Sequence, residues 1–490
     1  MKLKNHESTR ANAEKYLKES LGSNNAMFRD GQWEAIDALV SKGKRLLVVQ
    51  RTGWGKSSVY FIATKLLREK GYGPTIIISP LLALIRNQIN AAKKIGINAV
   101  TINSTNNHEW DNLIEEILMD NVDCLLISPE RLANEDFNNN VLNSIGSRIG
   151  LMVIDEIHCI SDWGHDFRPD YRRILNILQR LPVNTPVLGT TATANDRVIN
   201  DIESQLGDVE VHRGSLVRES LGLQAVPIKD TASRFVILSE FINQQLHSGI
   251  VYVLTKRDAI RVSDWLTQQG INSAAYFSGV ENDRFESSNL YREYLEKCLL
   301  NNQLKVLVST TALGMGFDKP DLGFVIHYQI PSSVVSYYQQ VGRAGRGIDS
   351  AIGLILSGNE DKEIHDFFRR SAFPAQQHIE VVLDTLSRAD GMTIRDLEEN
   401  INLRKGQIEK VLKFLSVENP STVMKDGNRW FRTSVDFQMD VERINHLTYQ
   451  REMEWQEIQD YITYNGCLMN FLRKALNDPD SSNCGKCANC

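Results

Sequence analysis

The sequence predicts an α/β protein with two parallel-sheet units, followed by a helical region and a cysteine-rich end. Up to about residue 358, β-branched runs alternate with helical patterns, and each run is continuously apolar, as in parallel strands covered on both faces. Beyond Gly358 the runs stop and apolar residues recur at helical spacing. The 490 residues are 42% hydrophobic and 24% charged, which excludes a disordered or fibrous protein and allows about three domains.

The first unit is expected over residues 1–210 and the second over residues 211–360, because each range holds its own series of strands and helices. The strands predicted in the first unit are Leu46–Val49, Thr75–Ser79, Asp123–Ser128, Leu151–Asp155 and Pro186–Thr190. Those predicted in the second are Ile250–Leu254, Ser273–Phe277, Lys305–Thr310, Gly323–Tyr328 and Ile352–Leu356.

Residues 361–437 are expected to form a small domain of three helices and a hairpin. Helical spacing over 379–386 and 408–415 predicts two helices, and Thr393 is a candidate cap for a third between them. The stretch Thr422–Phe431, with Asp426-Gly427 at its centre, predicts the hairpin. This combination favours a winged helix. The alternative is a plain helical connector that carries a hairpin.

The net charge of −6 means that a nucleic-acid partner must be held by a local basic channel. The longest apolar stretch, Thr75–Ile85, is interrupted by Ser79-Pro80 and is too short to cross a membrane. The polar N-terminus lacks the apolar core of a signal peptide. A cytoplasmic location is therefore expected.

The seven cysteines divide into two groups. Cys124, Cys159 and Cys298 lie in apolar or helical contexts and are expected to be buried. The others crowd the end of the chain, within a predicted helical subdomain over residues 438–490. Four thiolates bind Zn²⁺ tetrahedrally, although an iron–sulfur cluster uses the same ligands. The candidate zinc ligands are Cys467, Cys484, Cys487 and Cys490.

A glycine-containing loop, Gln50–Ser57, separates a predicted strand from a helix that we expect over Ser57–Glu69. Such a loop wraps backbone N–H groups around phosphates at a helix start. Lys56 would reach the β- and γ-phosphates, and the Ser57 hydroxyl would ligate Mg²⁺. Gln50 stands where the strict pattern has glycine. The candidate nucleotide-binding residues are Thr52, Gly53, Gly55, Lys56 and Ser57.

Two carboxylates, Asp155 and Glu156, stand at the C-terminal end of the predicted strand Leu151–Asp155, where ligands of open α/β sheets collect. Asp155 can hold Mg²⁺, and Glu156 can orient or deprotonate an attacking water. A solvated Asp-Glu turn is the ordinary interpretation of such a pair. The phosphate loop about one hundred residues upstream favours the catalytic one.

Taken together, these residues resemble a superfamily 2 helicase, and more narrowly a RecQ-like DNA helicase, from about Met27 to Cys490. The most specific match is Asp155–Tyr171, an aromatic-rich loop that begins with the family's DExH box, here Asp-Glu-Ile-His. The resemblance gives His158 a place in the catalytic box. It also implies that Trp163, Phe167 and Arg168 contact single-stranded DNA.

Other segments match the family in chain order. Phe28, Arg29 and Gln32 resemble the adenine-reading motif, and Thr191–Thr193 resembles the segment that couples the lobes. Candidate contacts to the DNA backbone are Ser79, Asn103, Ser104 and Arg131 in the first unit and Thr310 in the second. In the loop Thr310–Asp318, Gly316 and Asp318 are expected to face the nucleotide.

The last motif spans Gln339–Arg346 and supplies the remaining catalytic candidates. Arg346 is expected to act as an arginine finger, with Arg343 in support and Gln339 beside them. A planar guanidinium stabilises the charge that gathers on the γ-phosphate only when the two lobes close. The alternative for these arginines is a surface salt-bridge pair.

The resemblance implies two RecA-like lobes, then a winged-helix-like domain and a zinc-binding subdomain. It implies an ATP-hydrolysing helicase that uses Mg²⁺, moves 3′ to 5′ on single-stranded DNA and unwinds forked DNA. A monomer working with repair or recombination proteins is expected. Alternatives are a translocase that does not separate strands, an RNA helicase, and a non-catalytic adaptor; the four residues Lys56, Asp155, Glu156 and Arg346 speak against the last.

The chain departs from the family pattern in two notable places. Trp54 stands where the phosphate loop of the family has glycine, so the loop must accommodate a bulky ring. The predicted winged helix precedes the terminal cysteines, whereas in the family it follows them. The sequence is thus either a truncated piece or a differently built member. The hairpin carrying Trp430 and Phe431 is a candidate strand separator, although packing on its own helices is the favoured role.

Overall fold

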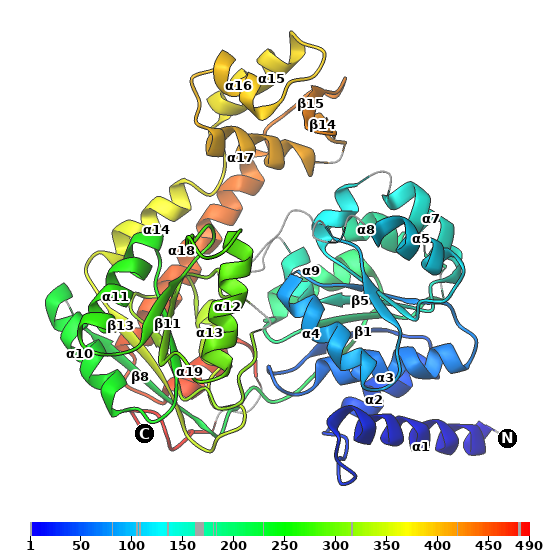
Figure 1. The fold of residues 1–490 in the computed structure, drawn as a ribbon, viewed down its shortest axis with the longest axis horizontal. Helices are drawn as coiled ribbons and strands as arrows, with labels where there is room; N and C mark the ends of the chain where they lie inside the picture. The colour runs from blue at the N-terminus through cyan, green and yellow to red at the C-terminus, as the bar shows by residue number, and fades with distance from the viewer. Residues whose placement is uncertain are drawn as a thin grey trace.

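The computed structural model describes residues 2–490, apart from 81, 104–105, 107–108, 135–136, 162–170, 180, 183, 229, 315–316, 419 and 479–481. It contains two α/β lobes side by side and a small third unit beyond the gap between them (Figure 1). The N-terminal helix α1 (Lys2–Leu21) lies against the first lobe, and the C-terminus lies at the second lobe.

The first lobe is built on a parallel sheet with strand order β3-β4-β2-β5-β6-β1-β7. Alternate residues of its strands enter different cores: Leu47 and Val49 pack on one face, Leu46 and Val48 on the other. Its strands are β1 (Arg45–Val49), β2 (Thr75–Ile78), β3 (Ala99–Thr101), β4 (Cys124–Ile127), β5 (Leu151–Asp155), β6 (Val187–Thr191) and β7 (Glu210–Arg213). Its further helices are α2 (Gln32–Val40), α3 (Lys56–Glu69), α4 (Leu82–Lys93), α5 (Trp110–Leu118), α7 (Asn143–Ile145), α8 (Arg172–Leu178) and α9 (Asp196–Leu206).

The second lobe repeats this plan, with strand order β10-β11-β9-β12-β13-β8, again parallel. Its strands are β8 (Leu221–Pro227), β9 (Gly249–Tyr252), β10 (Ser273–Tyr276), β11 (Val306–Ser309), β12 (Phe324–His327) and β13 (Ala351–Ser357). Its helices are α10 (Thr231–Gln244), α11 (Lys256–Gln268), α12 (Ser288–Leu300) and α13 (Val334–Val341).

Every strand predicted from a continuous apolar run is present, and the two-sheet fold class is confirmed. The sequence analysis missed β3, β7 and β8. β3 has only three residues. β7 is an edge strand of polar sequence, and each of its residues is exposed or half-buried, so it shows no apolar run. β8 is the other lobe's edge strand and alternates Leu221 and Leu223 with half-buried or exposed residues.

The third unit packs three helices and a hairpin around its own core. Thr393 caps the middle helix, and its hydroxyl accepts from the backbone N–H of Asp396, as predicted. The hairpin is present, but Asp426 pairs with Arg429, so its turn is Gly427-Asn428 and the predicted centre at Asp426-Gly427 is one residue early. The assignment as a winged helix stays a prediction. The elements are α15 (Gln376–Ser387), α16 (Ile394–Asn400), α17 (Lys405–Ser416), β14 (Val423–Asp426) and β15 (Arg429–Arg432).

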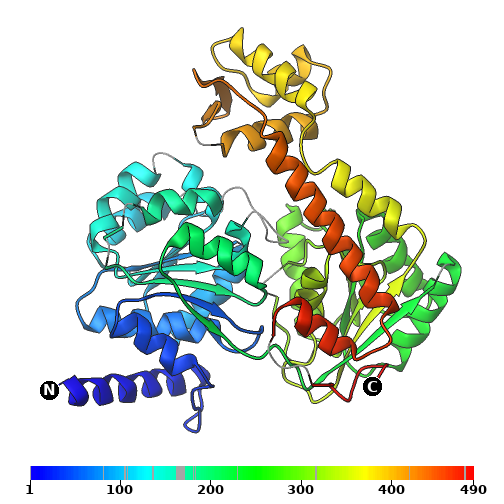
Figure 2. The ribbon, with the colours of Figure 1, turned by 180° about the vertical axis from the view of Figure 1, so that it is seen from behind.

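Two helices join the third unit to the second lobe: α14 (Asp361–Arg370) and the long α18 (Val441–Thr463) (Figure 2). Trp455, Ile458 and Tyr461 of α18 enter the core of the second lobe, and so do apolar residues of α19 (Leu468–Ala475). The buried Cys467 and Cys487 belong to the same cluster. The described part of the cysteine region therefore packs on the second lobe and shares its core.

Candidate functional site

The phosphate loop of the first lobe connects β1 to α3 and folds back on itself. Gly53 and Gly55 have φ of 82° and 99°, a left-handed conformation that suits glycine. A Cβ on Gly55 would also stand 2.6 Å from Nε2 of Gln32. Nζ of Lys56 donates to the carbonyl of Gln50 at 3.0 Å, which closes the loop. The start of α3 thus presents backbone N–H groups in the geometry that phosphates bind.

Trp54 fills the space beneath this loop. Its side chain is buried, and its indole Nε1 donates to the carbonyl of Asp30 at 3.2 Å. Nε2 of Gln32 donates to the carbonyl of Trp54 at 2.8 Å, and Oε1 of Gln32 accepts from the N–H of Arg29 at 2.8 Å. The predicted adenine-reading segment is thereby fastened to the phosphate loop. The guanidinium of Arg29 reaches the carbonyl of Gly53, and Phe28 packs near Trp33.

Asp155, at the end of β5, is a buried carboxylate held from three sides. It accepts from the hydroxyl of Thr190 at 2.6 Å, from the N–H of Glu156 at 3.1 Å and from Nε2 of Gln88 at 3.0 Å. Burial raises the pKa of Asp155 to about 6, and the charge of Glu156 adds to this, whereas the Thr190 bond and Lys56 oppose it. Burial likewise lowers the pKa of Lys56, against the pull of both carboxylates. A buried anion with this pKa fits a divalent cation beside the phosphate loop.

A line of polar contacts runs from Glu156 through His158 to the second lobe. Glu156 has a left-handed φ of 52°, and its Oε2 lies 3.3 Å from Nδ1 of His158. The same Nδ1 lies 2.9 Å from the hydroxyl of Thr191, which accepts from the N–H of Thr193 at 3.1 Å. Nε2 of Gln339 on α13 then donates to the hydroxyl of Thr193 at 2.5 Å. The segment 191–193 therefore connects the carboxylates to the partner lobe.

The predicted arginines of the second lobe follow α13 but lie in different places. Nη1 of Arg346 pairs with Asp318 at 2.8 Å, and burial lowers the pKa of Arg346 while Asp318 opposes the shift. Arg343 is buried inside the lobe, where its Nη1 donates to the carbonyl of Phe317 at 3.2 Å. The hydroxyl of Thr52 donates to the carbonyl of Gly342 at 3.1 Å, which joins the phosphate loop to this motif.

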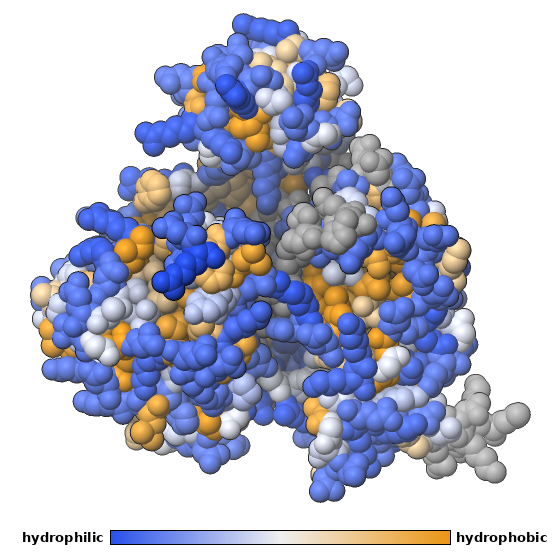
Figure 3. All heavy atoms as spheres, in the orientation of Figure 1, coloured by the Kyte–Doolittle hydropathy of each residue, from blue (hydrophilic) through white to orange (hydrophobic). Residues whose placement is uncertain are grey.

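A cleft of about 500 Å³ lies between the lobes at this point. The molecular surface is visibly hollowed between them (Figure 3). Arg29, Thr52 and Gly53 line the cleft from the first lobe, and Gly345 and Arg346 line it from the second. The arrangement can hold a nucleotide with its phosphates between the loop and Arg346.

The candidate nucleic-acid residues that the structure describes follow strand ends: Ser79 after β2, Asn103 after β3, Arg131 after β4 and Thr310 after β11. Since parallel strands end at one edge, those of the first lobe share an edge with the carboxylates. The guanidinium of Arg131 stacks 3.8 Å from the ring of Trp110, and burial lowers the pKa of Arg131. The remaining predicted residues lie outside the described residues: Ser104, Trp163, Phe167, Arg168 and Gly316.

Sequence reasoning missed three basic residues of the cleft: Arg51, Arg218 and Lys486. Arg218 lies in the segment between the lobes, and Lys486 lies between two cysteines, so neither belongs to a motif that indicates phosphate binding. These residues line the cleft only because the fold brings distant parts of the chain together. It also missed Gln88 and Thr190, which hold Asp155.

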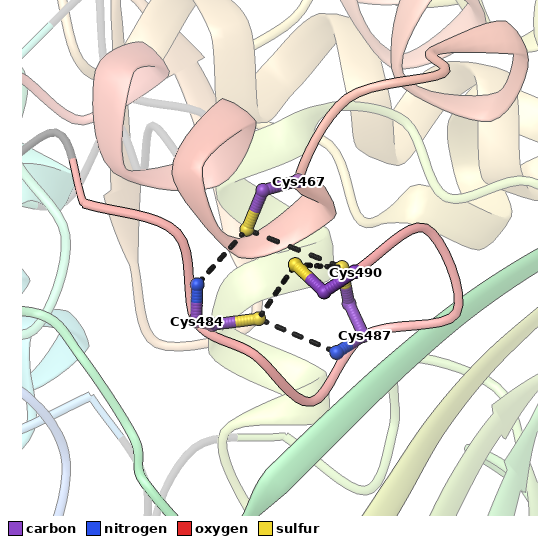
Figure 4. A group of neighbouring side chains, drawn as sticks. All are labelled: Cys467, Cys484, Cys487 and Cys490. Carbon is purple, nitrogen blue, oxygen red and sulfur yellow. Dashed lines mark hydrogen bonds between the residues drawn. The ribbon is translucent and has the colours of Figure 1, made fainter.

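The four terminal cysteines come together as predicted, with their sulfurs within 4.8 Å of one another (Figure 4). Sγ of Cys487 lies 3.4 Å from Sγ of Cys490 and 4.0 Å from Sγ of Cys467, and Sγ of Cys484 lies 3.9 Å from Sγ of Cys490. A tetrahedral zinc with Zn–S bonds of about 2.3 Å needs sulfurs about 3.8 Å apart. The donor set therefore fits a four-thiolate metal. Cys124, Cys159 and Cys298 are buried, as expected.

No helix in the described part of the chain has both the length and the apolar character needed to cross a bilayer.

Comparisons with known proteins agree with the site. Residues 29–202 match the DEAD/DEAH box helicase family, and residues 233–347 match the helicase conserved C-terminal domain. The Bacillus subtilis ATP-dependent DNA helicase RecQ is 37% identical over 336 residues, which cover 67% of this chain and 54% of that protein. The chain spans about half the length of this and several other curated relatives.

The probable ATP-dependent DNA helicase RecS of Bacillus subtilis is 28% identical over 474 residues, which cover 94% of this chain and 89% of that protein. Among solved structures, Mycobacterium smegmatis helicase Lhr, bound to single-stranded DNA and AMP-PNP, has a TM-score of 0.55 at 17% identity, covering 88% of this chain and 61% of that one. This likeness shows that both lobes have the RecA-like helicase fold. With its DExH box, its two matched helicase domains and its RecQ relatives, the chain belongs to the RecQ-like superfamily 2 DNA helicases.

Proposed function

We propose that the protein is an ATP-dependent DNA helicase that hydrolyses ATP in the cleft between its lobes. One observation supports this above the others: a line of polar contacts from Glu156 through His158 and the segment 191–193 to Gln339 joins the hydrolytic carboxylates to the opposite lobe. Such a connection allows nucleotide state and lobe position to depend on each other.

On the first lobe, the start of α3 and Lys56 bind the β- and γ-phosphates, and Gln32 with Arg29 holds the base end. Ser57 and Asp155 are the residues that would hold Mg²⁺, which neutralises phosphate charge when bound. Glu156 orients the attacking water and accepts its proton. The raised pKa of Asp155 fits a buried carboxylate whose negative charge a bound cation would stabilise.

On the second lobe, Arg346 approaches the γ-phosphate when the lobes close and stabilises the charge that develops there. Asp318 holds the guanidinium in the cleft beforehand. The buried Arg343 supports it by fixing the Phe317 carbonyl of the preceding motif. His158 and Gln339 lie on the connecting line between the lobes, so they position groups and do not themselves react.

Single-stranded DNA is proposed to cross the strand-end loops of both lobes, where Ser79, Asn103, Arg131 and Thr310 contact its backbone. The aromatic loop with Trp163 would stack on bases. Movement from 3′ to 5′ and unwinding of forked DNA follow from the family. The protein would act in the cytoplasm as a monomer, together with repair or recombination proteins. The cysteine cluster would hold structural zinc, since no ligand position is left open.

The test measures ATPase rate with and without single-stranded DNA, together with strand displacement from forked duplexes with 3′ or 5′ tails. Stimulation by DNA and displacement from the 3′-tailed fork are expected. Lys56→Ala should lower both nucleotide affinity and turnover, and Trp163→Ala should leave the basal rate but weaken stimulation. ATPase activity without displacement would instead identify a translocase, and stimulation by RNA alone would identify an RNA helicase.

A further inference from the structure

Three basic side chains to which the sequence analysis gave no role line the interlobe cleft beside Arg29 and Arg346. Arg51 follows β1, Arg218 lies in the segment between β7 and β8, and Lys486 lies between Cys484 and Cys487. All three border the cavity that also contains Thr52 and Arg346. They come from three distant parts of the chain, yet they face one space.

The charge of this space contrasts with that of the whole protein. Arg29, Arg51, Arg218, Arg346 and Lys486 line the cleft, against the carboxylates of Glu219 and Asp349. The chain as a whole carries −6. Within the described residues, Arg346 is ion-paired to Asp318, whereas no ion pair joins the other four cleft cations to a carboxylate. An excess of positive charge in a concave site is an arrangement that attracts an anion.

Arg218 is the deepest of these cations, with only 6% of its surface exposed. Its Nη2 donates to the carbonyl of Thr52 at 2.6 Å, and its Nη1 donates to the carbonyl of Ala344 at 3.3 Å. It therefore bridges the phosphate loop and the arginine-finger motif, but among the described residues its Nε has no hydrogen-bond partner. Burial lowers the pKa of Arg218 to about 10; Arg346 and Arg51 act in the same direction, whereas Tyr338 opposes the shift. A buried cation among other cations is costly until an anion joins it.

Lys486 is exposed at the mouth of the same cleft, and the cysteine loop holds it there. Its Nζ donates to the carbonyl of Glu219, next to Arg218 in the chain. The N–H of Ala488 donates to the carbonyl of Leu223 on β8 at 2.8 Å, so the loop is docked on the edge strand. A Cβ on Gly222 would stand 3.2 Å from the carbonyl of Lys486, which shows how closely the loop approaches β8.

We propose that Arg51, Arg218 and Lys486 form a cationic wall that binds nucleotide phosphates, so that the cysteine loop contributes directly to nucleotide affinity. This rests on the proposed function, in which the cleft binds ATP. The occupant is a nucleoside di- or triphosphate because the wall continues the phosphate loop at Thr52 and Gly53 and faces Arg346. The candidate DNA residues that the structure describes, in contrast, do not line this cleft.

The test titrates the full-length protein with fluorescent methylanthraniloyl-ADP and Mg²⁺ in the absence of DNA. Because Lys486 is exposed, Lys486→Gln is expected to raise the Kd about two- to fivefold, and less at high salt. Arg218→Gln should raise it about tenfold or more, because its charge is buried. Lys486→Arg keeps the charge and should restore most of the affinity. Lys474→Gln, an exposed lysine of α19 away from the cleft, is the matched control.

Bound metal and the melting temperature are measured for every variant, so that a disturbed cysteine loop is recognised. An unchanged Kd in Lys486→Gln overturns the proposal, and so does a Kd in Lys486→Arg as weak as that of the glutamine variant. If the variants change DNA affinity and leave nucleotide affinity unchanged, the cationic wall binds nucleic acid, and the proposal is likewise overturned. If the wild type bound no nucleotide, or if Lys56→Ala bound it normally, the proposed function itself would fail.

Discussion

Nε2 of Gln339 on the second lobe donates to Oγ1 of Thr193 on the first lobe at 2.5 Å. Thr193 is in turn bonded to Thr191, whose hydroxyl lies 2.9 Å from the ring of His158. The connection from Glu156 to the second lobe therefore consists of side-chain and backbone groups contributed by both lobes.

Gln339→Ala is expected to reduce DNA-stimulated ATP turnover about tenfold, because the hydroxyl of Thr193 loses its partner at the lobe interface. Nucleotide affinity should change less than twofold, since Gln339 does not line the cleft. Steady-state kinetics and nucleotide titration separate the two effects. Thr193→Val and the double variant complete a cycle, and purely additive losses would show that the two side chains do not act together.

Arg346→Ala should lower kcat by about 10³-fold or more, as expected for an arginine that stabilises charge only in the transition state. Single-turnover hydrolysis with saturating DNA measures this directly. Arg395→Ala removes an arginine whose side chain is 86% exposed on the third unit, and it should behave as wild type. A decrease in kcat of less than about tenfold in Arg346→Ala would remove the finger role.

Asp155 predicts a pH dependence of stability in the protein without Mg²⁺ and nucleotide. Its folded pKa of about 6 lies above the ordinary 3.8, so the ionised carboxylate disfavours folding and stability falls as pH rises between these values. Asp155→Asn should thus melt a few degrees higher than wild type at pH 7.5, with the difference vanishing near pH 4. The comparison is made by calorimetry, with the exposed Asp384→Asn as control. An equal melting temperature at pH 7.5 would contradict the buried-anion description.

The same carboxylate predicts the pH dependence of activity. Because protonation removes the charge that would hold Mg²⁺, ATP hydrolysis should decline as pH falls below about 6. Raising the Mg²⁺ concentration should shift this decline to lower pH, since cation and proton compete for one site. Initial rates across a pH series at two Mg²⁺ concentrations measure the effect. A decline that did not move with Mg²⁺ would assign it to another group.

Removing the metal should destabilise the whole second lobe, because Cys467 and Cys487 belong to its core. A chelator that removes the metal is expected to lower the melting temperature of the lobe. Metal analysis should find about one zinc per chain and no visible absorption. Iron with sulfide and a coloured protein would establish the iron–sulfur alternative. Loss of metal without any change in melting would contradict the shared core.

The features that could be predicted from the sequence are those that depend on residues close together in the chain. Lys56 and Asp155 were recognisable because each belongs to a short motif at a strand end, and buried strands such as β5 are continuous apolar runs. The polar edge strand β7 gave no such signal. Arg218 and Lys486 acquire their role only by meeting across 268 residues of chain. Arg343 and Arg346 look alike in sequence, and only packing separates the buried residue from the one facing the cleft.

The long helix α18 makes the small third unit a lever on the second lobe. Its 23 residues span about 35 Å, and its C-terminal half is fixed in that lobe by Trp455, Ile458 and Tyr461. The N-terminal end of α18 leads to the third unit, where the carbonyl of Ser416 on α17 accepts from Nη2 of Arg173 on the first lobe at 3.0 Å. A pivot of about 10° between the lobes would sweep that end through about 6 Å and part this bond. A small rotation between the two lobes would therefore produce a displacement of several ångströms in the third unit.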